Sequence, residues 1–374
     1  MKQALAFSLE QSPFLSMLSD QQIQQTLRFM GRPSGTPMNR ETTREICQRN
    51  QSKAMLAGSI SSVGTQYLVG IEALDCETGS SMARVGGSAA SKDKVLTTLG
   101  QAASELRGKL GESLAVVRRY DAPLEEATTG SLDALKMFNL GVKTLNEQGS
   151  AASIPYFKRA IDLDPNFAGA YGITAVMYGN IGESAQAAEY AKRAYALRDR
   201  VSELERLVLE GFQEGFGVGD QVKGEQIVEL TKRTFPRYEG AYVDSSAYKM
   251  GRGDYLASIP DAQQALNTTR TNSIALGNLA FAYLALNRFD EAGAVLAKGL
   301  ADGIEPIALA VTYYALYFAK HDPDGMQKQL AIATGKPGYE DALLFYSVRH
   351  RRLLRPLEAS QRRISPRHRV RKTQ

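Results

Sequence analysis

Hydrophobic and small residues recur in the same order twice between Ser131 and Arg200, at positions that lie 34 residues apart. The side chains at the first three positions are large, medium-sized and small. Those at the next two are large or small and then small, and the sixth residue stops a helix. The paired positions are Met137 and Tyr171, Leu140 and Thr174, Gly141 and Ala175, Phe157 and Ala191, Ala160 and Ala194, and Pro165 and Asp199. A period of this length is typical of a helix–turn–helix repeat, in which each helix pair buries its apolar face against the next pair. The pattern therefore predicts an array of stacked helix pairs.

The interval and the order of side-chain sizes resemble the tetratricopeptide repeat (TPR). The resemblance implies a right-handed α-solenoid in which the first helix of each pair lines a concave groove that binds a protein or peptide partner. We expect the small residues, such as Gly141 and Ala160, where two helices approach closely, and the large ones in the gaps between helices.

Further units follow with less regular spacing. The third, at residues 201–237, ends at Pro236, which lies 37 residues after Asp199. Its Gly215, Gly217 and Gly219 are expected in a flexible loop between helices, because no G-K-[ST] follows them as in a phosphate-binding loop. Pro260 is expected to kink the second helix of the fourth unit. We predict five to six helix pairs between residues 131 and 348, with an unpartnered helix at 339–348.

Residues 1–120 combine helical and strand patterns and predict a small α+β unit, joined to the array by a linker at 121–130. Helical spacing of apolar residues covers 2–10, 20–30, 42–50 and 92–119, the last as one long amphipathic helix. Strands are expected at 14–18, 54–61, 66–74 and 81–86. The expected fold class is α+β, a small α/β module followed by an all-α TPR solenoid, predominantly helical overall.

The run REICQRNQSKAMLAGSISSVGTQYLVGIEALDCETGSSMAR carries a second resemblance. It is similar to the small module that precedes TPR arrays in bacterial serine/threonine protein kinases and CadC-like regulators, and to the amino-terminal domain of TolB. The matching features are Gly58-Ser59 in the first strand and the D-x-x-T-G turn at Asp75, Thr78 and Gly79. Those modules usually begin with a strand before the first helix, so we expect a truncated module with one open sheet edge.

Charge separates the end of the chain from the rest. The net charge is +5, but residues 349–374 hold nine Arg and one Lys against one Glu, which is +9, so the remainder carries 5 − 9 = −4. We expect 349–374 to be a basic disordered tail, either a real arm or the result of a lost native carboxyl end. A slightly acidic body makes nucleic-acid binding an unfavoured hypothesis, and only the tail would carry it.

The sequence contains no apolar run long enough for a membrane span, and its N-terminus does not resemble a signal peptide. The chain as encoded is expected to be cytoplasmic. An extracytoplasmic location is the alternative, if the chain derives from the region after a membrane span in a kinase.

No catalytic constellation is present in the sequence. Kinase elements such as an H-R-D loop and a D-F-G motif are missing, and the three histidines all lie from His321 onward. Cys47 and Cys76 lack metal-ligand spacing, and we expect them to pack in the α+β unit, with a bridge between them only in an oxidising compartment. We therefore expect no enzyme activity, no cofactor and no metal.

The groove positions implied by the TPR resemblance are mostly apolar. The candidates for peptide contact are Phe138, Val142, Asn146, Val176, Asn180 and Phe281, with the two asparagines as amides that could bond a peptide backbone. The alternative is that these residues pack against neighbouring helices or are covered by the α+β unit. The predicted function is a non-catalytic interaction scaffold or signalling module. The alternative is a sensor or docking fragment of a membrane-anchored kinase that lacks the kinase domain.

Overall fold

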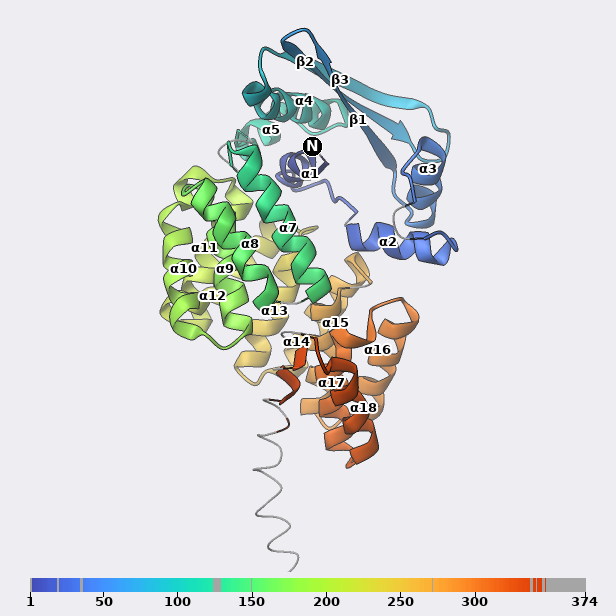
Figure 1. The fold of residues 1–374 in the computed structure, drawn as a ribbon, viewed down its shortest axis with the longest axis vertical. Helices are drawn as coiled ribbons and strands as arrows, with labels where there is room; N and C mark the ends of the chain where they lie inside the picture. Colours follow the sequence, from blue (N-terminus) through green and yellow to red (C-terminus); the bar gives the residue numbers. More distant parts are fainter. Residues whose placement is uncertain are drawn as a thin grey trace, which may run out of the picture.

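The computed structural model describes residues 2–18, 20–33, 36–123, 129–148, 150–270, 272–336, 339–340, 342–344 and 347. It contains a small three-stranded sheet with its helices near the N-terminus, followed by a curved array of helix pairs (Figure 1). The predicted fold class is confirmed. The basic tail at 349–374 lies outside the described residues.

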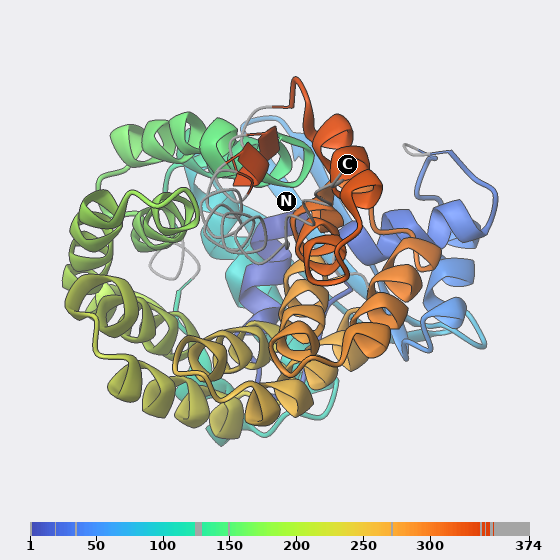
Figure 2. The same ribbon diagram turned by 90° about the horizontal axis from the view of Figure 1, so that it is seen from below.

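The solenoid consists of antiparallel helix pairs that stack in chain order (Figures 1 and 2). Each first helix packs on its second helix, and each second helix packs on the first helix of the next pair. The helices are α7 (Leu132–Gln148), α8 (Ser150–Leu163), α9 (Ala168–Asn180), α10 (Ser184–Ala196), α11 (Glu203–Phe212), α12 (Gln221–Thr234), α13 (Glu239–Gly251), α14 (Tyr255–Thr268), α15 (Ser273–Ala285), α16 (Phe289–Ala301), α17 (Pro306–Ala319) and α18 (Pro323–Ala333).

Close approach of the helices depends on the small residues that define the repeat. A methyl group added at Gly141 would lie 2.6 Å from Cε1 of Phe157, so only glycine lets α7 meet α8 at this point. Ala160, Ala175 and Ala194 are fully buried for the same reason. A larger side chain at such a position would overpack the interface, which typically costs about 1–3 kcal/mol.

The third unit differs from the sequence prediction. Gly215 and Gly217 do not lie in a loop, because α11 continues directly into a π-helical segment, η3 (Gln213–Val218). Gly219, at φ +81°, ends the helix and begins the loop. Gly215 and Gly224 both lie against the ring of Tyr248, and a methyl group at Gly224 would come within 2.6 Å of its Oη. The glycines therefore permit close packing on α13. The wider π-helical turn alters how this unit packs against the neighbouring helices of the array.

The N-terminal unit is an antiparallel sheet with strand order β1-β2-β3, with α4 and α1 on one face and α3 against the first part of β1. Val69, Ile71 and Ala73 of β2 point toward α4 and α1 and are buried. The elements are α1 (Lys2–Glu10), α2 (Asp20–Phe29), α3 (Arg40–Arg49), β1 (Ala54–Val63), β2 (Gln66–Asp75), β3 (Ser81–Ala89), the 3-10 turn η1 (Lys92–Lys94), α4 (Val95–Lys109) and α5 (Leu114–Tyr120).

Two predictions for this unit are wrong. Residues 14–18 form no strand, because they cross toward the solenoid instead of the sheet, and Arg237 donates a hydrogen bond to the carbonyl of Phe14 at 2.6 Å. The helix predicted at 92–119 is divided into η1, α4 and α5. Gly111 adopts φ +99°, a conformation that ends α4, and Ser113 caps the N-terminus of α5.

The N-terminal unit lies along one edge of the solenoid, against the turns that join successive repeats (Figure 1). The ring of Tyr120 packs on Phe235 with centroids 5.4 Å apart. The Gln22 amide donates to the carbonyl of Thr268 at 3.0 Å, and Arg28 pairs with Glu305 at 2.9 Å. One hydrophobic core continues from the sheet through α1 into α7, α9 and α11. The two parts are therefore packed as one body.

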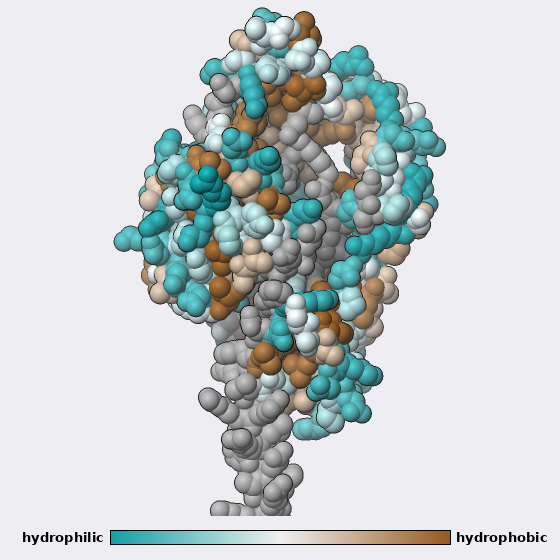
Figure 3. All heavy atoms as spheres, in the orientation of Figure 1, coloured by the Kyte–Doolittle hydropathy of each residue, from teal (hydrophilic) through white to brown (hydrophobic). Residues whose placement is uncertain are grey.

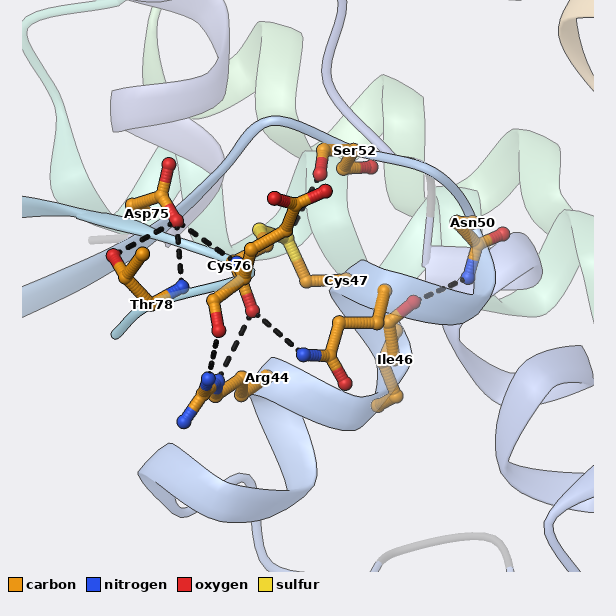
Figure 4. Close-up of a disulfide and its surroundings, with 10 residues drawn as sticks. Arg44, Ile46, Cys47, Asn50, Ser52, Asp75, Cys76 and Thr78 are labelled. Atoms are coloured by element: carbon orange, nitrogen blue, oxygen red, sulfur yellow. Dashed lines mark hydrogen bonds between the residues drawn. A yellow bond between two sulfur atoms is a disulfide. The ribbon is translucent and has the colours of Figure 1, made fainter. Parts of the chain in front are cut away.

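A disulfide joins Cys47 of α3 to Cys76, directly after β2 (Figure 4). Both side chains are buried, and their Cα atoms are 5.9 Å apart, within the usual range for a bridge. Hydrogen bonds to the carbonyl of Cys76 from Arg44 Nε (3.0 Å) and Gln48 Nε2 (2.9 Å) hold the same turn against α3. A bridge between these two cysteines was expected only in an oxidising compartment.

We predict that the double substitution Cys47→Ala and Cys76→Ala lowers the free energy of unfolding by about 3 kcal/mol, because the bridge closes a loop of 29 residues in the unfolded chain. Chemical denaturation of purified protein measures this, with wild-type protein in reductant as the matched condition. Mass spectrometry after alkylation without reductant should find no free thiol in the wild type. Two alkylated thiols would contradict the bridge.

A buried charge cluster connects α12, α13 and α14. Asp261 accepts hydrogen bonds from Lys232 Nζ at 2.6 Å, from Ser245 Oγ at 2.7 Å and from Lys249 Nζ. Burial by itself would raise the pKa of Asp261, but these hydrogen bonds outweigh it and hold the pKa below its usual value. The carboxylate therefore stays ionised between two ammonium groups.

We predict that Asp261→Ala destabilises the protein by about 3 kcal/mol, because it leaves two partly buried ammonium groups without their main partner. Asp290→Ala is the matched control. Its carboxylate pairs with Lys320 at 3.0 Å but its side chain is 98% exposed, so the expected loss is below about 1 kcal/mol. Equal shifts of the urea midpoint for both variants would show that the buried cluster adds no stability.

Candidate functional site in the interior of the solenoid

A cavity of about 180 Å³ lies between the third and fourth helix pairs. We call it the central cavity. Its walls are mainly apolar and come from α11, η3, α12 and α13, with Phe212, Phe216, Tyr238 and Tyr248 as its aromatic residues. The cavity lies beside the π-helical segment, in the unit whose length departs from the 34-residue interval. A mainly apolar cavity with a few polar groups has the composition of a ligand or side-chain pocket.

A second cavity, of about 340 Å³, lies beside the first and is more polar. We call it the edge cavity. It is bounded by the segment from Glu10 to Gln22 of the N-terminal unit and by the start of α13, and Tyr238 lines both cavities. Glu239 accepts hydrogen bonds here from Thr269 Oγ1 and Asn272 Nδ2. The edge cavity thus exists only where the N-terminal unit meets the solenoid.

Two carboxyl groups near these cavities are held in a poorly hydrated environment. Burial raises the pKa of Asp244 to about 7 and of Glu205 to about 8. Glu10, which lines the edge cavity, is exposed to solvent. Burial and then the nearby carboxylates, Asp244 first, also raise the pKa of Tyr238. The interior therefore favours neutral acids near pH 7.

Three of the predicted groove residues lie together. Phe138, Val142 and Val176 belong to one partly buried cluster at the first two helix pairs. The ring of Phe138 lies 5.0 Å from that of Phe167 and 6.4 Å from that of Phe7 in α1, measured between centroids. Much of their surface is used in packing, and the N-terminal unit contributes to it, as the alternative in the sequence analysis expected.

The other candidates are separated from this cluster. Asn180 is exposed at the end of α9, and its amide donates to Ser150 Oγ at 3.2 Å. Phe281 on α15 is 38% exposed. Asn146 belongs to α7, but its side chain lies outside the described part of the structure. A role for these six residues in peptide binding stays a prediction.

The residues that line the two cavities were missed by sequence reasoning. Asp244 stands among ordinary polar residues of α13, and Glu10 becomes a neighbour of Tyr238 only through packing of α1 on the array. One signal was present: the third unit exceeded the 34-residue interval and contained three closely spaced glycines. An irregular repeat of this kind indicates a local misfit, which is where a cavity forms.

Among the described residues, no group of three or more His, Cys, Asp or Glu side chains is arranged to hold a metal ion. Likewise, no helix in the described ranges is both long and apolar enough to cross a membrane. On the face drawn in Figure 3, hydrophilic side chains cover most of the outer helices.

Comparison with known proteins supports the repeat. Residues 249–303, which include α14, α15 and α16, match the family model of the tetratricopeptide repeat. This match falls on the regular fourth and fifth units. No curated protein sequence matches the chain.

Several solved structures are similar to the solenoid. PilW, a widely conserved type IV pilus biogenesis factor, is 13% identical, with 58% of this chain and 99% of PilW covered and a TM-score of 0.39. TTC0263, a thermophilic TPR protein of Thermus thermophilus, is 22% identical, with 49% and 98% covered and a TM-score of 0.37. YrrB, a TPR protein with an unusual peptide-binding site, is 15% identical, with 51% and 97% covered and a TM-score of 0.32.

The raised carboxyl pKa values predict a pH dependence of stability. The folded chain holds these protons more tightly than the unfolded chain, whose Asp and Glu pKa values are near 3.8 and 4.5. The contribution of these groups to the free energy of unfolding is therefore greatest below those values and falls as the pH rises toward 8. We predict that the free energy of unfolding of Asp244→Asn falls less between pH 5 and pH 8 than that of the wild type, by on the order of 2 kcal/mol.

Thermal unfolding at intervals of half a pH unit measures this effect. Asp199→Asn is the matched control, because the side chain of Asp199 is 76% exposed, and it should follow the wild-type curve. If the stability of the wild type and of Asp244→Asn depends on pH in the same way, the carboxyl group of Asp244 ionises in the folded protein with little loss of stability.

Proposed function

We propose that this chain is a non-catalytic scaffold that holds a partner protein by a peptide segment in the interior of the solenoid. The observation that carries the proposal is the central cavity, an aromatic-lined gap between two first helices in an array of helix pairs. The matched TPR stretch supports an interaction role, since stacked helix pairs of this kind create extended concave surfaces. We expect one apolar side chain of the partner to enter the central cavity and the flanking backbone to run along the first helices.

The chemistry of the lining determines which peptides fit. Phe212 and Phe216 offer aromatic surface, while Asp244, with a pKa of about 7, can donate a hydrogen bond when neutral or accept one when ionised. A peptide with an apolar anchor next to a hydrogen-bonding side chain would satisfy both. Acidic peptides are disfavoured, because Asp244, Glu205 and Glu10 would repel them once ionised.

We predict that Ala247→Trp abolishes peptide binding. Ala247 lines the central cavity from α13 and is itself exposed, so an indole at this position would fill the cavity without a buried clash. Peptides selected from a displayed random library on the full chain should bind Ala247→Trp at least about tenfold more weakly, a loss of about 1.4 kcal/mol.

The control is Ala185→Trp, which adds the same side chain at an exposed site on α10. It should bind the selected peptides as the wild type does. If Ala247→Trp also binds them normally, the central cavity is not the peptide site.

The disulfide favours a second, more specific proposal about location. A buried bridge between Cys47 and Cys76 is stable in an oxidising compartment and uncommon in a reducing cytosol. We infer that the chain works outside the cytoplasm, which agrees with the alternative of a sensor or docking region attached to a membrane-anchored serine/threonine kinase. Genomic DNA upstream of the coding region tests the kinase association, since an in-frame kinase domain and membrane span are expected there. Their absence would leave the free scaffold.

A further inference from the structure

The two edges of the N-terminal sheet are protected very differently. An edge strand exposes unpaired N–H and C=O groups, and soluble proteins usually protect such edges with charged side chains, bulges or a covering element. β3 has all three kinds of protection. It carries Arg84, its pairing with β2 is irregular between Ala73 and Leu74, and Lys109 of α4 donates to the backbone carbonyl of Arg84 at 2.9 Å.

β1 has none of these features over most of its length. No charged residue or proline occurs between Ala54 and Val63, and its pairing with β2 is regular. Every residue from Gly58 to Val63 is exposed, including Ile60 at 41% and Val63 at 60%. α4 packs on β2 and β3, and α3 reaches only the first part of β1. The second half of this edge is therefore open.

We propose that β1 pairs antiparallel with β1 of a second copy of this chain, which joins the two sheets into one of six strands. Antiparallel pairing of a strand with itself satisfies two-fold symmetry, so both edges close and no free β1 edge remains. The strand is suited to this, because it carries no charge that would face a like charge in the second copy.

Side-chain sizes indicate the register. Ile60 and Gly58 lie on the same side of the sheet, since they pair with Val69 and Ile71, which face the core. A pairing centred on Ser59 places Ile60 of each copy opposite Gly58 of the other. The exposed isoleucine then covers the gap above a glycine, and small residues, Ala57 and Ser61, meet on the opposite face. A partner of different sequence would lack this built-in match.

The area of one strand pair limits the strength of the dimer. Stable interfaces bury about 1,200–2,000 Å² in total, and a single pair of short strands buries less. We therefore expect a reversible dimer with a dissociation constant of about 10–500 µM, which sedimentation velocity over a matching concentration range measures. Ser59→Lys, which brings two ammonium groups together at the centre, should weaken the dimer at least about tenfold. Ser88→Lys, at an exposed position of β3, should leave it unchanged.

Cross-linking tests the geometry directly. Both natural cysteines are joined to each other, so Ser59→Cys provides one free thiol per chain. Directly opposed residues of an antiparallel pair are close enough for a disulfide. Mild oxidation of Ser59→Cys should give a covalent dimer, and Ser88→Cys should give no covalent dimer. A monomeric wild type at 500 µM, a dimer that Ser59→Lys does not weaken, or preferential cross-linking of Ser88→Cys would overturn the proposal.

Discussion

The close approach of helices at small side chains is the constraint on which the rest of the molecule depends. Gly141 meets Phe157, and Ala160, Ala175 and Ala194 are fully buried where adjacent helices meet. Each helix pair has an apolar face that only the next pair can bury, so each pair is stabilised by its contacts with the neighbouring pairs. The curvature of the solenoid and its concave interior follow from this stacking.

The third helix pair departs from this regular packing, and the candidate site lies beside it. The π turn after α11 places Gly215 and Gly224 against Tyr248 and leaves the central cavity beside them. The same interior excludes enough water to raise the pKa of Asp244 and Glu205 well above their ordinary values. The irregular unit therefore lines a pocket that contains a carboxyl group able to change charge near neutral pH.

Local patterns were enough to predict the array but not the site. The 34-residue interval placed the helix pairs because the contacts behind it lie between neighbours in sequence, as between Gly141 and Phe157. The edge cavity depends on Glu10 meeting Tyr238, more than 200 residues away, and no local pattern encodes that contact. The predicted strand at 14–18 was wrong for a related reason: its apolar spacing suits a strand, but the segment bonds to Arg237 of the solenoid. Phe138 also packs against Phe7 of α1, a contact between distant parts of the chain that no local pattern encodes.

The two surfaces singled out by the structure are far enough apart to act independently. The sheet and the last helix pairs lie at opposite ends of the molecule (Figure 1), and the central cavity belongs to the third and fourth pairs. β1 contributes nothing to either cavity, so a dimer through this edge leaves the interior of each solenoid unchanged. The disulfide holds α3 to the sheet. The neighbouring helix α2 contacts the end of α14 through Gln22 and the start of α17 through Arg28, so this region connects the sheet to the solenoid. A symmetric pair of scaffolds would then present two identical interiors, and a partner with two copies of the recognised segment would bind more tightly than either segment alone.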